Sequence, residues 1–141
     1  MSVETVLVRD GTQRDYPAVA RIQGECAESA QWPLGDYAAF PLLVAEIGGE
    51  MAGFCWRRQV TRQEAELLNL GVAPRMRRKG VASVLLEALR AKASGDIFLE
   101  VAENNAAAIA LYTCRGWVRI GLRQGYYPGT INAVVMKKAS C

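Results

Sequence analysis

The stretch from residue 67 to residue 92 constrains the fold of this chain more than any other part of its sequence. An apolar run at 67–72 leads into a loop in which four of the five residues 75–79 are basic, and a helical pattern follows. The apolar residues of that pattern recur at the spacing of one helix face: Val81, Val84, Leu85, Ala88 and Leu89. A strand, a loop and an amphipathic helix in this order predict a mixed α/β fold in which helices pack on a sheet.

The remaining segments predict the other elements of such a fold. Apolar and β-branched runs bounded by turn residues predict strands at 3–9, 42–47, 51–60, 64–72, 97–101, 117–126 and 133–138. Helical spacing predicts helices at 12–26, around 37–40, at 81–94 and at 106–114. Gly48 and Gly49 predict a hairpin turn, Asn104 or Asn105 is expected to cap the last helix, and Gly116 is expected to end it. We expect an α/β (α+β) fold with a mixed, mostly antiparallel sheet of about seven strands, flanked by about four helices.

The length and composition predict one soluble domain. With 141 residues, of which 51% are hydrophobic and 22% charged, we expect a single domain over residues 1–141. No apolar run approaches the roughly 20 residues that a membrane-spanning helix needs, and the N-terminus lacks a signal-peptide pattern. We therefore expect a cytoplasmic protein without a membrane partner. The four cysteines lack CxxC spacing and are expected to be reduced thiols.

The chain contains no histidine. This excludes Ser-His-Asp and Cys-His catalysis and any histidine-ligated metal centre, and we expect no metal. A general base must be a carboxylate, a tyrosine, a thiolate, a lysine or ordered water. The formal net charge of +3 is too small to indicate nucleic-acid binding.

The basic loop before the predicted helix has the features of an anion site. The first turn of a helix has unpaired N–H groups and a partial positive charge, Gly80 allows close approach of the backbone, and Ala82 is small. Basic residues at a helix N-terminus are electrostatically unfavourable unless an anion is present. The pattern lacks the glycine-rich motifs of nucleotide hydrolases and dinucleotide-binding proteins, and it suits a pyrophosphate. The alternative is a basic helix start that serves solubility or an RNA contact.

Two residues further along are candidates for acid–base chemistry. Glu100 interrupts an apolar strand, where a carboxylate is costly unless it has a partner or lies at an open edge. Tyr112 lies two helical turns beyond Asn105 and can protonate a departing thiolate. The alternatives are a surface carboxylate for Glu100 and core packing for Tyr112.

Two motifs resemble those of the GNAT superfamily of N-acetyltransferases. Arg77-x-x-Gly80-x-Ala82 after a strand matches the [QR]xxGx[GA] signature, and residues 100–117 resemble the block ExxxxNxxAxxLYxxxGF. The alanine-rich version NAAAIALY, with Tyr126-Tyr127-Pro128 after it, is most similar to the bacterial ribosomal-protein-alanine N-acetyltransferases of the RimI type. The resemblance implies a GNAT fold and acetyl-CoA as cosubstrate.

The resemblance also implies roles for particular residues. Glu100 would deprotonate the acceptor amine, directly or through water, and Tyr112 would protonate the coenzyme A thiolate. The residues that would contact the cofactor are Leu70, Gly71, Val72, Arg77, Arg78, Lys79, Gly80, Val81, Ala82, Ser83 and Asn105. The implied acceptor is the N-terminal α-amine of a ribosomal protein, an alanine, acetylated by direct transfer in a ternary complex. Trp32, Tyr126 and Tyr127 would line the peptide groove.

The sequence departs from the RimI pattern in three places, of which the first and the third bear on the acceptor. The segment with Trp32 looks short, Trp117 replaces a phenylalanine, and residues 130–133 lack the acidic residue that relatives often have there. Two alternatives to this acceptor and activity remain open. One is a GNAT enzyme for a lysine, a polyamine or an antibiotic. The other is a non-catalytic module that binds coenzyme A.

Overall fold

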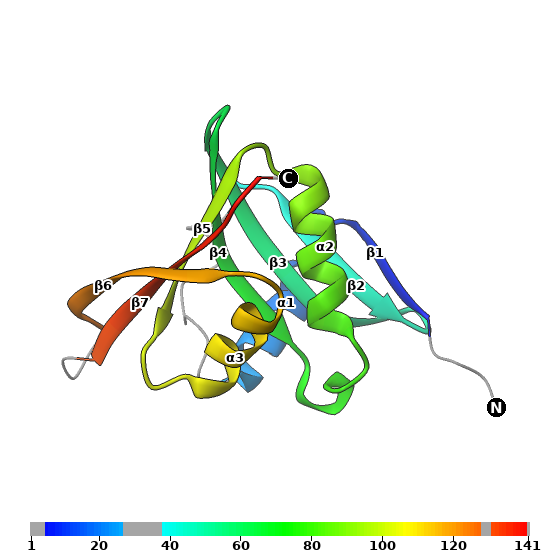
Figure 1. The fold of residues 1–141 in the computed structure, drawn as a ribbon. Coiled ribbons are helices and arrows are strands. Elements are labelled where there is room, and N and C mark those ends of the chain that lie inside the picture. Colours follow the sequence, from blue (N-terminus) through cyan, green and yellow to red (C-terminus); the bar gives the residue numbers. More distant parts are fainter. Residues whose placement is uncertain (1–4, 27–37, 128–130, 141) are drawn as a thin grey trace. The chain divides into compact units, whose positions relative to one another are not determined.

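The computed structural model describes residues 5–26, 38–127 and 131–140 (Figure 1). These residues form seven strands and three α-helices. In chain order, the elements are β1 (Val6–Asp10), α1 (Tyr16–Glu25), β2 (Leu42–Ile47), β3 (Glu50–Thr61), β4 (Glu64–Val72), α2 (Val81–Lys92), β5 (Asp96–Ala102), α3 (Ala106–Cys114), β6 (Val118–Tyr127) and β7 (Ile131–Lys138), with 3-10 turns at Gln13–Asp15 and Pro74–Met76. The strands follow the order β1-β2-β3-β4-β5-β7-β6, which confirms the predicted mixed sheet.

One predicted helix differs from the structure. Residues 38–40 form a turn and a bend, and Tyr37 lies outside the described residues. The helical spacing of Tyr37 and Phe40 was too short a signal, because a helix needs more than one turn before its hydrogen bonds offset the cost of ordering it.

The chain divides into two compact units. Unit 1 comprises Met1–Arg58 and Leu67–Lys92, and unit 2 comprises Gln59–Glu66 and Ala93–Cys141. The prediction of a single domain over 1–141 stays a prediction.

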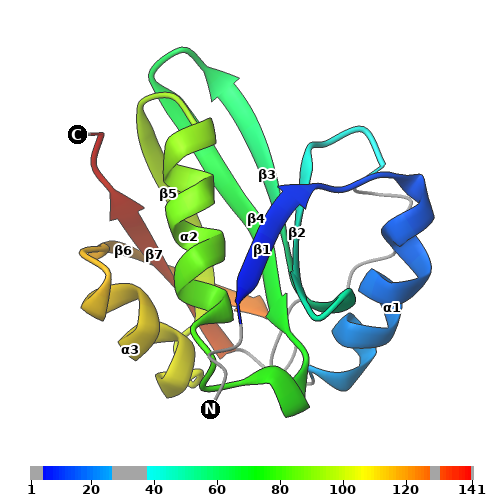
Figure 2. The same cartoon turned by 90° about the vertical axis from the view of Figure 1, so that its right-hand side faces the viewer.

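In unit 1, two helices enclose an antiparallel group of strands. β1 pairs with β2, and β2 with β3. α1 and α2 lie on opposite faces of these strands (Figure 2). Val19 and Ile22 of α1 are fully buried, as are Leu85 and Leu89 of α2. The predicted face of α2 is therefore largely correct, although Leu86 is also buried and Val84 and Ala88 are only half-buried.

The turn between β2 and β3 is the predicted hairpin. Its two central residues, Gly48 and Gly49, have φ values of +60° and +81°. Positive φ at both central residues matches the twist of the flanking strands and is adopted by glycine at low cost.

In unit 2, β5 and β6 both pair with β7. The start of β4 pairs with β5 in parallel, whereas β7 is antiparallel to β5 and to β6. Gly95 precedes β5 with a φ of +80°, and a Cβ atom there would overlap the carbonyl group of Gln63. Only glycine fits this close approach.

The ends of α3 are those that the sequence predicts. The Asn105 side chain accepts a hydrogen bond from the N–H of Ala108 at 3.1 Å and caps the helix. At the other end, the N–H groups of Gly116 and Trp117 donate to the carbonyls of Thr113 and Tyr112. With a φ of +88° at Gly116, this is a Schellman motif.

Candidate active site

The loop between β4 and α2, in unit 1, has an unusual backbone. Arg78 has a φ of +65° and Gly80 a φ of +82°. A left-handed arginine is uncommon and persists only where its surroundings impose it. A Cβ atom at Gly80 would have no described atom within 4 Å, so the space beside this glycine is open. The loop thus presents its backbone at an open surface directly before Val81, the first residue of α2.

The first turn of α2 supplies hydrogen-bond donors at this surface. The N–H of Val84 donates to the carbonyl oxygen of Gly80 at 3.1 Å, which is the bond expected one turn into a helix. The N–H groups that precede it, beginning with those of Val81 and Ala82, belong to the turn whose donors point out of the helix end. Such donors, the helix dipole and an open approach fit the pyrophosphate of coenzyme A. The predicted cradle residues of unit 1 are therefore together in the structure; their contact with the cofactor stays a prediction.

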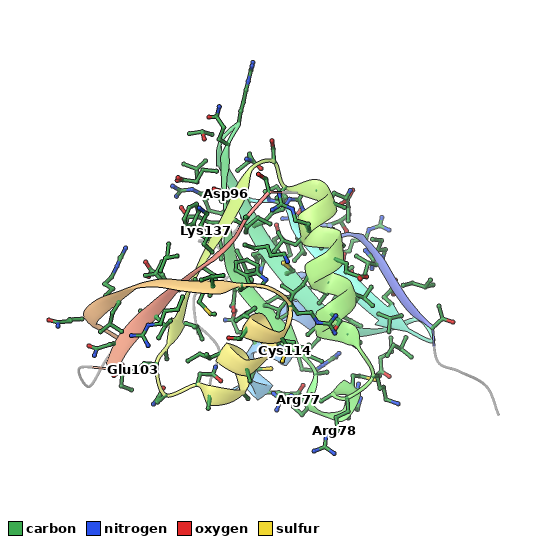
Figure 3. The ribbon with its side chains drawn as sticks, viewed as in Figure 1. Arg77, Arg78, Asp96, Glu103, Cys114 and Lys137 are labelled. Carbon is green, nitrogen blue, oxygen red and sulfur yellow. The ribbon has the colours of Figure 1, made fainter. Side chains whose placement is uncertain are left out.

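The basic side chains of the loop differ in their contacts. Arg75 forms an ion pair with Glu50 of β3. Arg77 Nη2 lies 3.8 Å from the sulfur of Cys26, whose thiol in turn lies 3.3 Å from the carbonyl oxygen of Val72. Arg78 is exposed and is directed away from the ribbon (Figure 3). Of the four basic side chains, Arg75 thus has a carboxylate partner. Contact of Arg77, Arg78 and Lys79 with the cofactor stays a prediction.

The end of β4 leads into this loop. Gly71 is buried, and a Cβ atom there would lie 2.5 Å from the ring of Phe54. Leu70 and Val72 are half-buried on the other face of the strand. Asn69 is buried and donates to the side-chain oxygen of Gln23 at 3.2 Å, a pair that the sequence does not reveal. Both contacts lie on the buried face of β4, and they help to fix the position of the loop that follows.

Glu100 belongs to unit 2 and lies on the less buried face of β5. Buried and half-buried residues alternate along this strand, and Glu100 shares its face with Phe98 and Ala102. Its carboxylate forms an ion pair with Arg123 of β6, with Oε1 and Nη2 2.8 Å apart. Of the two conditions considered for this carboxylate, a partner or an open edge, the structure shows the partner. The identity of the partner was missed, because Arg123 lies on another strand and no local pattern marks it.

Tyr112 and Asn105, also in unit 2, lie on and before α3. Tyr112 is only 7% exposed, and its ring centroid lies 5.6 Å from that of Trp117 at an interplanar angle of 56°. The core packing considered for this tyrosine is thus present, and its acid role stays a prediction. Asn105 contacts Ala108 as the helix cap, so any contact of its side chain with a cofactor would be additional to this structural role.

The predicted peptide-groove residues are not described in a way that tests them. Trp32 lies outside the described residues, and Tyr126 and Tyr127 belong to β6, with only their backbone described.

The thiols and carboxylates of the described residues do not form a metal site. No group of three or more of the metal-ligating residue types lies together there. Cys26, Cys55 and Cys114 are free thiols, as predicted, and burial raises the pKa of Cys55 to about 12. Within residues 5–26, 38–127 and 131–140, no helix has the length and apolar character that crossing a membrane requires.

Comparisons with known proteins agree with this geometry. The chain is 39% identical over 95 residues to the ribosomal protein bS18-alanine N-acetyltransferase of Escherichia coli K12, and the alignment covers 62% of this chain and 64% of that protein. It is 37% identical over 87 residues to N-alpha-acetyltransferase RimI of Mycobacterium tuberculosis, covering 59% of this chain and 55% of that protein. The alignments thus span less than two thirds of the length of these relatives.

A solved structure and a family model also match this chain. The crystal structure of the ribosomal-protein-S18-alanine N-acetyltransferase from Escherichia coli matches with a TM-score of 0.84 and 29% identity, covering 96% of this chain and 94% of that chain. This confirms the predicted fold. A family model described as acetyltransferase (GNAT) family matches residues 7–117. The chain therefore belongs to the GNAT family of acetyltransferases.

Proposed function

We propose that this protein is an acetyl-CoA-dependent N-acetyltransferase that acetylates the N-terminal α-amine of a ribosomal protein, an alanine. The observation that carries the proposal is the turn at Gly80, with its positive φ and open approach at the N-terminal end of α2. The acceptor is inferred from the relatives, whose names specify an alanine of ribosomal protein bS18. Because ribosomal proteins are made and assembled in the cytoplasm, we propose that the reaction takes place there.

The cosubstrate supplies an activated acetyl thioester. The N–H groups of Val81, Ala82 and Ser83 would hold its pyrophosphate, aided by Gly80 and by Arg77, Arg78 and Lys79. The backbone of Leu70, Gly71 and Val72 would bind the pantetheine arm. These contacts fix the thioester relative to the acceptor, which reduces the entropy cost of the reaction.

Glu100 and Tyr112 would carry the protons. The amine nitrogen forms a bond to the acetyl carbon, its proton passes to Glu100 directly or through water, and the carbon–sulfur bond breaks. The sulfur leaves with the electron pair of that bond and receives a proton from Tyr112. Glu100 ends protonated and Tyr112 deprotonated, so one proton returned from the carboxyl to the phenolate through water restores both.

An α-amine suits a site with a single carboxylate base. Its pKa of about 7.7–8.0 leaves roughly a third of it neutral at pH 7.5, whereas a lysine with a pKa of about 10.4 is neutral to roughly 0.1%. A much larger fraction of an α-amine is therefore already neutral and able to attack the thioester without prior removal of a proton.

The test measures thiol release from acetyl-CoA with a peptide that copies the first residues of bS18 and begins with alanine. The matched control is the same peptide with its N-terminus already acetylated and one internal lysine free. We expect release only with the free N-terminus, and mass spectrometry should place the acetyl group there. Release only with the control, or only with a free polyamine, would move the assignment to another amine. Binding of acetyl-CoA without release on any amine would indicate the non-catalytic module.

A further inference from the structure

The ion pair between Glu100 and Arg123 joins two strands that are not neighbours. Glu100 lies on β5 and Arg123 on β6, and β7 runs between them. Adjacent strands are about 4.8 Å apart, so the two backbones are separated by roughly twice that distance. Only a long side chain on β6 can reach a carboxylate on β5.

The register of the three strands explains how this reach is possible. Glu100 is paired with Val135 of β7, and Val135 is paired with Gly121 of β6. Gly121 is thus the β6 residue directly across from Glu100, and it has no side chain. Arg123 lies two residues further along β6 and therefore projects from the same face. Its guanidinium then extends diagonally across β7 towards Glu100.

The two partners differ in their contact with solvent. The side chain of Glu100 is 25% exposed and that of Arg123 is 58% exposed. Ion pairs with an exposed partner contribute little to folding stability. What the pair does accomplish is to limit the rotamers of the carboxylate, since an unpaired glutamate on an open sheet face samples several. A general base benefits from such a restriction, because proton transfer requires hydrogen-bond geometry.

We propose that Arg123 is a positioning residue that holds the Glu100 carboxylate in the orientation in which it receives the proton of the acceptor amine. The inference rests on the proposed function, in which Glu100 is the base. Arg123 need not touch the acceptor or the cosubstrate, because it acts through Glu100.

The experiment compares four variants for turnover and for the KM of acetyl-CoA, with the alanine peptide as acceptor. They are Arg123→Gln, Arg123→Lys, Arg119→Gln and the double variant Glu100→Gln/Arg123→Gln, measured beside Glu100→Gln. Arg119→Gln is the matched control, because Arg119 is an exposed arginine of the same strand whose removal changes the net charge equally. Thermal unfolding of each variant shows whether it is folded.

We expect Arg123→Gln to lower turnover by about tenfold or more with an unchanged KM for acetyl-CoA. Arg123→Lys should recover part of the loss, since lysine keeps the charge and most of the reach, and Arg119→Gln should resemble the wild type. In the Glu100→Gln background, removal of Arg123 should have no further effect, because the residue through which it acts is already changed.

Three outcomes would overturn the inference. They are wild-type turnover in Arg123→Gln, an equal loss from Arg123→Gln in the Glu100→Gln background, or an effect confined to the KM of acetyl-CoA. Should Arg123→Gln fail to fold, the Arg123→Lys variant decides, with wild-type turnover counting against the inference and an intermediate value for it. Failure of the proposed function is distinguishable, because the wild type would then acetylate no peptide or Glu100→Gln would keep full turnover.

Discussion

Replacing Gly80 by alanine separates two consequences of one methyl group: backbone strain and obstruction of an anion. Gly80 has a φ of +82°, and a Cβ atom there would project into open space. An L residue in the left-handed region costs about 1–2 kcal/mol, and the smaller entropy of the unfolded alanine chain returns roughly 0.4–1 kcal/mol of this. We expect a net loss of about 1 kcal/mol in the free energy of unfolding.

A matched control is available in the hairpin between β2 and β3. Gly49 has a φ of +81°, and a Cβ atom there would also have no described atom within 4 Å. Gly49→Ala should therefore lose as much stability as Gly80→Ala, which urea unfolding can measure. Only Gly80→Ala places its methyl group where the pyrophosphate is expected to approach the backbone.

Calorimetric titration with coenzyme A then tests the anion site. Gly80→Ala should bind at least about tenfold more weakly than the wild type, equivalent to ~1.4 kcal/mol, while Gly49→Ala binds normally. If both variants are equally destabilised and both bind coenzyme A as the wild type does, the turn at Gly80 is not the pyrophosphate site.

Three further predictions concern stability. Gly95→Ala should be strongly destabilised, by more than ~3 kcal/mol, because its Cβ would overlap the Gln63 carbonyl; urea unfolding with near-native stability would contradict this. Asn105→Ala removes the cap of α3 and should lower the free energy of unfolding by about 1 kcal/mol, whereas Asn105→Asp should largely preserve it, which thermal unfolding can measure. Hydrogen bonds from the Arg9 guanidinium, at 2.8 and 2.9 Å, are the main reason that the pKa of Asp15 is lowered. The unfolded state then binds more protons than the folded state below about pH 4, so stability should fall with falling pH there, and less steeply in Asp15→Asn; an unchanged slope would refute this.

Local features of the fold were predictable because each is set by neighbouring residues. The cap at Asn105, the helix end at Gly116 and the glycine turn at Gly48 and Gly49 depend on backbone preferences within a few positions. The spacing of Gly80 and Ala82 after a strand likewise locates the loop, because strand, loop and helix are contiguous in the sequence.

Partners that lie far apart in the sequence were not predictable. Arg123 meets Glu100 because of a three-strand register and the missing side chain of Gly121. Glu50 forms an ion pair with Arg75, and Gln23 accepts a hydrogen bond from buried Asn69. In both pairs the partners come from segments that are distant in the sequence. A single sequence records the residue types of such pairs but not the packing that brings them together.

A crystal structure of the protein with coenzyme A would locate the pyrophosphate most directly. We expect the pyrophosphate to lie at the first turn of α2, accepting hydrogen bonds from backbone N–H groups of residues 80–83. A coenzyme bound elsewhere, with that turn filled by the protein's own side chains, would contradict it.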